Sequence, residues 1–156
     1  MSVAQESSTP HTHELKARVV ENTFSPGIAH CWANGDIFLS AWYNAISIGT
    51  PECERGGCEV LRHYLPKLTD QAFVTYMKGF IRQEAQHTLT HMHYNQALAA
   101  RGYNLNRFRM FFSTAKPFIP KQFAMKLALA TIAATEHFFA CLANTTFKHN
   151  LLAHAE

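Results

Sequence analysis

A carboxylate and an imidazole stand three residues apart on one apolar helix stripe, at Glu84 and His87. Side chains at positions i and i+3 project from the same face of a helix. Charged groups placed where a helical core expects leucine must be satisfied by a partner, and the pattern predicts that this partner is a metal ion. The neighbours on the stripe are apolar, namely Phe73, Met77, Phe80, Ile81, Tyr94 and Leu98.

Glu-x-x-His on a helix of a bundle is the ligand pattern of di-iron and di-manganese carboxylate proteins. His91 falls on the same stripe, and we interpret it as a residue that hydrogen-bonds to a metal ligand rather than binding the metal itself. Direct ligation and a core histidine are the alternatives. For Glu84 and His87 the alternative is a buried hydrogen-bonded pair without metal. His93 lies off the stripe and is predicted to be exposed.

Glu136 is a second carboxylate at helical spacing among apolar residues. It shares a stripe with Ile132 and Phe139 in a segment that carries no other carboxylate before the last residue. An unpaired buried carboxylate must be protonated, paired or metal-bound. Metal ligation therefore competes with a side chain that reaches the bundle surface or pairs with a histidine.

Glu54 is a third carboxylate of interest, in register with Cys58 on a short predicted helix. Two more glutamates, Glu52 and Glu59, lie close by, so spacing does not choose among them. The pattern alone favours a solvated acidic first turn, which the helix dipole stabilises.

The 156 residues are 47% hydrophobic and 16% charged, which suits one globular domain with a core. We predict an irregular arm over residues 1–30 and a helical domain over 31–156. Helices are predicted over 36–47, 51–65, 70–101 and 121–152, with a break at residues 49–51 and a C-terminal glycine at Gly102. A loop is predicted over 103–120. No strand alternation is convincing, so the predicted class is all-α, with long helices suited to antiparallel packing.

Charge and cysteine usage exclude several classes of function. The net charge is +3 and the basic residues are scattered, so no nucleic-acid face is predicted. The first residues are polar and show no signal peptide, which makes the cytoplasm the expected location. No Cys-x-x-Cys pair occurs, and reduced thiols are expected at the four cysteines, Cys31, Cys53, Cys58 and Cys141.

Residues 127–147 form an apolar window about long enough to span a bilayer. Glu136, His137 and Asn144 fall inside it, and ionisable groups in lipid are costly. The window is therefore predicted to be a fully buried bundle helix, and membrane contact is not expected.

A run of residues around Glu84 resembles a known bacterial family of predicted metal-dependent hydrolases with a ferritin-like helical fold. The resemblance covers residues 36–150 and is most specific over 84–103. The matching segments are Asn44-Ala45-Ile46-Ser47, Pro51-Glu52-Cys53-Glu54, Phe80 to His87, His91, Tyr94 to Leu98, Arg101-Gly102-Tyr103 and Thr135-Glu136-His137-Phe138.

The resemblance implies four metal ligands: Glu54, Glu84, His87 and Glu136. Two departures from the family weaken the assignment of Glu54, because Cys53 replaces a usual glycine and residues 56–57 are glycines where aromatic residues are usual. The family continues into a further helix with a second Glu-x-x-His, which this sequence does not contain. The chain is thus expected to correspond to the N-terminal part of the family and to form an incomplete antiparallel bundle.

The resemblance implies a metal-dependent hydrolase with a ferritin-like di-metal carboxylate site holding iron or manganese, as one or two ions. A di-iron oxidase or oxygenase is an alternative on chemical grounds. A non-catalytic helical module with a degenerate site and a membrane-associated helical protein are further alternatives. The expected substrate is a small molecule, hydrophobic if the aromatic-rich helices line a pocket, and a homodimer that assembles one site from two copies is another hypothesis.

Overall fold

Three long helices make up most of the protein, as a computed structural model describes it at residues 15–19, 21, 24–25, 27–107 and 121–153. Helix α1 spans Ile37–Tyr64, the 3-10 turn η1 spans Leu65–Lys67, α2 spans Gln71–Ala100 and α4 spans Lys121–Lys148. No strand occurs in these ranges, so the all-α prediction is confirmed. Residues 1–14 of the predicted arm and 108–120 of the predicted loop lie outside the described residues.

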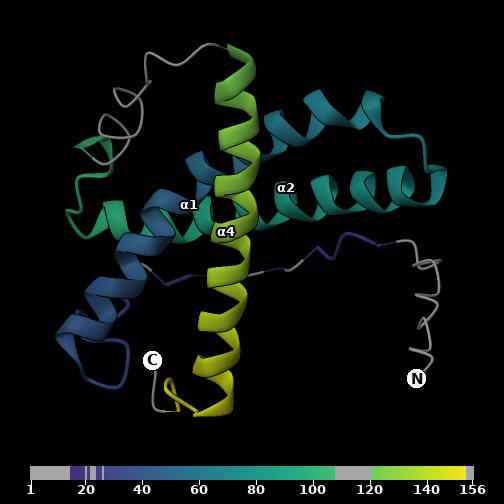
Figure 1. Cartoon of the computed structure of the whole chain (residues 1–156). Helices are drawn as coiled ribbons and strands as arrows, with labels where there is room; N and C mark the ends of the chain where they lie inside the picture. The colour runs from purple at the N-terminus through teal and green to yellow at the C-terminus, as the bar shows by residue number, and fades with distance from the viewer. Residues whose placement is uncertain (1–14, 20, 22–23, 26, 108–120, 154–156) are drawn as a thin grey trace, which may run out of the picture.

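Helices α1 and α2 form an antiparallel hairpin through η1 (Figure 1). Asp36 caps α1, because its side chain accepts from a backbone amide of the first turn at 2.8 Å. Asp70 caps α2 in the same way, accepting from two amides. Gly102 follows the end of α2 with a φ of 89°, which confirms the predicted C-terminal glycine.

Helix α1 is continuous through Pro51, so the predicted break at residues 49–51 is wrong. Proline has no amide hydrogen and leaves the carbonyl four residues earlier, that of Ser47, without its helical partner. The side-chain amide of Asn95 on α2 donates to this carbonyl at 2.8 Å. A side chain thus satisfies the helix where the backbone cannot, and α1 runs on to carry Glu54 against α2.

Helix α4 crosses the α1–α2 pair rather than running alongside it (Figure 1). The hydroxyl groups of Tyr43 on α1 and Thr146 on α4 are hydrogen-bonded at 2.7 Å. Gly57 of α1 faces Ile132 of α4, and a Cβ added at Gly57 would make an ordinary van der Waals contact with Ile132 at 3.8 Å. These contacts fix one face of α4 on α1.

Much of α4 is exposed, so the prediction of a fully buried helix over 127–147 is wrong. Phe138 is 53% exposed and Phe147 is 82% exposed. The physical reason is that, of the described helices, α1 alone packs substantially on α4. By length and composition only, the segment Phe123–Lys148 would suffice to cross a bilayer.

The described part of the N-terminal arm follows α2 in the direction of the helix. Near its start, the Leu15 carbonyl oxygen occupies the space where a Cβ on Gly79 would lie. Near its end, the Arg101 guanidinium donates to the Ala29 carbonyl at 3.1 Å. Glycine at position 79 therefore allows the arm to pack directly on the helix backbone.

The contact between Asn95 and the Ser47 carbonyl predicts a coupled effect on stability. Asn95→Ala should lower the free energy of unfolding by about 1–3 kcal/mol, because it leaves a buried carbonyl without a donor. In a Pro51→Ala background the cost should be smaller, since the new backbone amide can bond Ser47. Urea denaturation of the four proteins measures the coupling, with the exposed Gln96→Ala as control. If Asn95→Ala lowered the free energy of unfolding equally in both backgrounds, the proposed role of Asn95 at the Ser47 carbonyl would be contradicted.

Candidate metal centre

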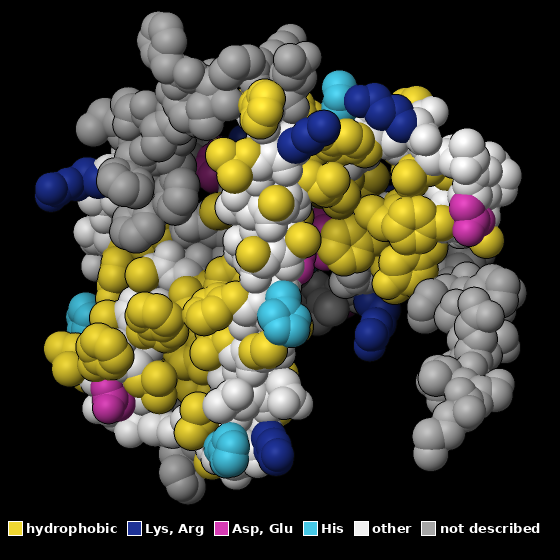
Figure 2. Space-filling model, viewed as in Figure 1, with side chains coloured by type: hydrophobic (Ala, Val, Ile, Leu, Met, Phe, Trp, Pro, Cys, Tyr) yellow, Lys and Arg dark blue, Asp and Glu magenta, His cyan; other side chains and the backbone are white. Residues whose placement is uncertain are grey.

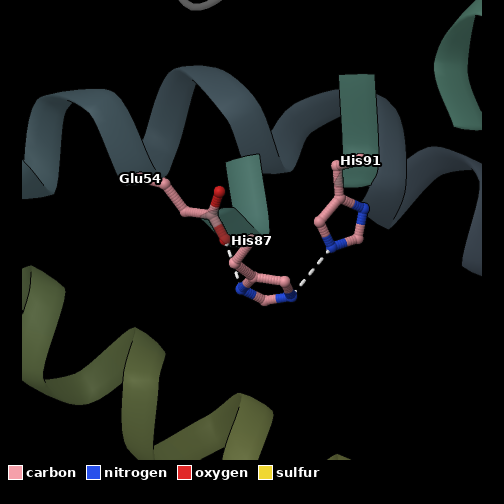
Figure 3. A group of neighbouring side chains, drawn as sticks. All are labelled: Glu54, His87 and His91. Atoms are coloured by element: carbon pink, nitrogen blue, oxygen red, sulfur yellow. Dashed lines mark hydrogen bonds and ion pairs between the residues drawn. The ribbon is translucent and has the colours of Figure 1, made fainter. Parts of the chain in front are cut away.

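Glu54 from α1 and two histidines from α2 converge on one point of the structure. One ligand atom from each of Glu54, His87 and His91 lies within 4.8 Å of the others. His87 lies between the other two side chains, and the group faces the ribbon of α4 (Figure 3). The antiparallel hairpin therefore brings together residues that are more than thirty positions apart in the sequence.

Glu54 is the centre of the polar contacts in this cluster. Its Oε1 lies 2.6 Å from His87 Nδ1, and its side chain is 6% exposed. Glu59 is exposed and Glu52 is partly exposed, so the structure selects Glu54 among the three neighbouring glutamates. The alternative of a solvated acidic first turn is wrong for Glu54, because α1 begins at Ile37 and the residue lies deep within the helix.

His87 is held in its protonated form by carboxylates. The hydrogen-bonded Glu54 carboxylate, and after it the nearby Glu84 carboxylate, raise the pKa of His87 to about 10, against an opposing effect of burial. The Glu84 contact is the longer, with Oε2 at 3.7 Å from His87 Nδ1. Because 52% of the His87 side chain is exposed, solvent screens these interactions and reduces their contribution to folding free energy.

A chain of hydrogen bonds holds His91 in the neutral tautomer that carries its proton on Nδ1. The Asn95 amide donates to the Ser47 carbonyl, so its oxygen accepts from the Ser47 hydroxyl at 3.0 Å. That hydroxyl then accepts from His91 Nδ1 at 2.8 Å, which leaves a lone pair on His91 Nε2, 3.1 Å from His87 Nε2. Burial, and secondarily the charge of His87, lower the pKa of His91 to about 4.

Thr88 holds the Glu54 carboxylate from the side away from His87. Its hydroxyl lies 2.7 Å from Glu54 Oε2 and 2.9 Å from the Glu84 carbonyl. Sequence reasoning assigned no role to Thr88, Ser47 or Asn95. The available signal was spacing, because Thr88 follows Glu84 by four residues and Asn95 follows His91 by four.

Glu84 and Glu136 flank the three clustered residues. Glu84 is part-buried, with 12% of its side chain exposed, and Glu136 lines the same cavity from α4. Burial, and then the charges of Glu84 and Glu54, raise the pKa of the Glu136 carboxyl, while His87 lowers it. All four ligands implied by the resemblance therefore border one space, and His91 lies among them.

The donor set of this cluster fits a divalent transition metal. Two histidines four residues apart on one helix face bind a single ion in metalloproteases. Two imidazoles and one carboxylate are the protein ligands of catalytic zinc sites and of iron(II) oxygenases. The bonds from Thr88 to Glu54 and from Ser47 to His91 orient the donors, as supporting groups do in metal sites.

The all-α fold and the cluster of Glu54, His87 and His91 place this chain in the class of helical proteins with a candidate metal site. Within that class, the chain matches over residues 16–156 the model of a family described as predicted metal-dependent hydrolases. The protein belongs to this family. No curated protein and no solved structure matches it.

The raised pKa of His87 predicts a dependence of stability on pH. Its folded-state pKa, about 10, exceeds the ordinary value of 6.5, so the charged ring stabilises the fold fully below pH 6.5 and this contribution disappears as the pH rises through about 10. Chelator-treated protein should therefore lose more unfolding free energy across this window than His87→Gln does. His93→Gln, an exposed histidine of the same helix, should behave as the native chain. Parallel curves of unfolding free energy against pH for native protein and His87→Gln would refute the raised pKa of His87.

Proposed function

We propose that this protein is a metal-dependent hydrolase whose ion is held by Glu54, His87 and His91. The observation that carries the proposal is the convergence of their ligand atoms within 4.8 Å, on side chains that further hydrogen bonds hold in place. Membership of the predicted metal-dependent hydrolase family supports the same chemistry. A bound divalent ion supplies a water molecule of lowered pKa and polarises the scissile group.

The side chains of the cluster have defined tasks in this proposal. Thr88 and Ser47 keep Glu54 and His91 oriented. Glu136 enters the same cavity from α4, and its raised pKa suits a general base that takes a proton from water and returns it to the leaving group. In the overall reaction the water oxygen bonds to the acyl carbon, the bond to the leaving group breaks, and the leaving group gains the proton.

The carboxylates of Glu54, Glu84 and Glu136 around one cavity favour a second candidate, a di-metal site of the ferritin-like type. Glu84 and Glu136 would then join Glu54 and the histidines as ligands of two iron or manganese ions. Carboxylate-rich sites with few histidines suit these metals, and di-iron sites also support oxidase or oxygenase chemistry. The number of ions bound per chain separates the two candidates.

Metal analysis tests the proposal directly. Protein produced with added iron, manganese and zinc should hold one ion per chain, or two if the di-metal form is right. Glu54→Gln and His91→Gln should each weaken binding by about 10–100-fold or more, while His93→Gln should not. Removal of the metal should lower the melting temperature, since a ligand present at 100 times its Kd stabilises by about 2.7 kcal/mol. Protein without metal, and with a melting temperature insensitive to chelator, would support the non-catalytic alternative.

Glu136→Gln separates a base from a ligand. If Glu136 is a general base, the variant should keep its metal and lose about 10²–10⁴-fold in kcat on a chromogenic ester. If Glu136 binds a second ion, the metal content should fall from two ions to one. Glu59→Gln, an exposed glutamate of α1, is the matched control and should leave both quantities unchanged. Full activity of Glu136→Gln would contradict both roles.

A further inference from the structure

A cavity of about 920 Å³ opens between α1 and α4, with Glu54, His87 and His91 in its wall. Hydrophobic side chains gather on both sides of α4 (Figure 2). The volume lies at the upper end of the usual range for ligand pockets, about 300–1,000 Å³. Apolar side chains from the two helices supply much of the lining, among them Ile46, Leu127, Ile132, Phe139 and Leu142.

Glutamates are the most numerous charged side chains around this cavity. Among its described lining residues there is no lysine or arginine, whereas five glutamates line it, namely Glu52, Glu54, Glu59, Glu84 and Glu136. The charged imidazole of His87 is already paired with Glu54. Glu52 is paired with Arg55, but no lysine or arginine among the described lining residues could bind a carboxylate or phosphate head group, which would meet repulsion from the other glutamates.

We propose that the cavity binds a neutral long-chain aliphatic ester, with the chain against the apolar lining and the ester group at the Glu54–His87–His91 cluster. This inference rests on the proposed hydrolase function and names its substrate class. Hydrolysis adds the water oxygen to the acyl carbon, breaks the C–O bond and yields an alcohol and a carboxylic acid, which releases a proton. The resulting carboxylate faces the acidic lining, so charge repulsion favours its release.

Gly56 is an exposed glycine of α1 at the edge of the cavity. It lines the cavity, and a Cβ added to it would meet no atom within 4 Å. Glycine inside a helix is unfavourable relative to other residues, so helix formation does not account for its presence. Gly56 leaves open space beside the cluster, and a side chain there would occupy the room of the aliphatic chain. Ala128 lines the cavity from α4.

Binding to metal-free protein tests the inference apart from catalysis. Equilibrium dialysis of chelator-treated full chain against methyl decanoate and against decanoate, below their aggregation limits, gives the two affinities. Methyl decanoate should bind at least about tenfold more tightly than decanoate, since about 1.4 kcal/mol corresponds to a factor of ten. Gly56→Leu and Ala128→Phe should each weaken ester binding by a similar factor. Ala41→Leu, an exposed residue of α1 outside the cavity, should not.

Two variants on different helices guard against a folding defect, and circular dichroism together with metal content verifies each protein. Equal or tighter binding of decanoate would overturn the inference that the head group is neutral. No binding of the ester by protein that still takes up metal would overturn the inference and leave the proposed function standing. If analytical ultracentrifugation shows a dimer and this dimer does not bind the ester, a second copy covers the cavity. That result also overturns the inference. Ester binding by protein that takes up no metal would instead remove the hydrolase proposal.

Discussion

The hydrogen bond from the Asn95 side chain to the Ser47 carbonyl holds α1 and α2 in one register, and the site depends on that register. The contact between Thr88 and Glu54 fits the same register of the two antiparallel helices. A slip of one helical turn, about 5.4 Å, would separate Glu54 from both Thr88 and His87. Pro51 is the origin of this arrangement, because it frees the carbonyl that Asn95 bonds.

The metal-type cluster is also satisfied without an ion. The charged His87 ring donates its Nδ1–H to the Glu54 carboxylate and its Nε2–H to the lone pair of His91 Nε2. No buried side-chain nitrogen or oxygen of the described residues lacks a partner. Metal binding by His87 would have to displace one of these two ring protons, so the ion and the proton compete for the same nitrogen. The charged histidine thus preserves the geometry that a metal would use.

Helix α4 contributes Glu136 and much of the cavity wall, yet it has few polar ties to the hairpin. Among the described residues, Thr146 bonds Tyr43 near the C-terminal end of α4, and Asn34 donates to the Leu151 carbonyl beyond it. Near the middle of α4 the contact is apolar, with Ile132 facing Gly57. Because α4 crosses α1 rather than lying along it, the space beside the crossing is left open. The same geometry accounts for both the cavity and the exposed phenylalanines.

Spacing along the chain predicts the all-α class, the C-terminal glycine at Gly102, and the shared face of Glu84, His87 and His91. These features follow from the helical repeat and from local hydrogen bonding, which involve residues only a few positions apart. Spacing could not choose Glu54 over Glu52, could not show that α1 continues past Pro51, and overestimated the burial of α4. Those outcomes were decided by contacts between helices, because the register and the crossing of two helices depend on side chains that meet only once the chain has folded.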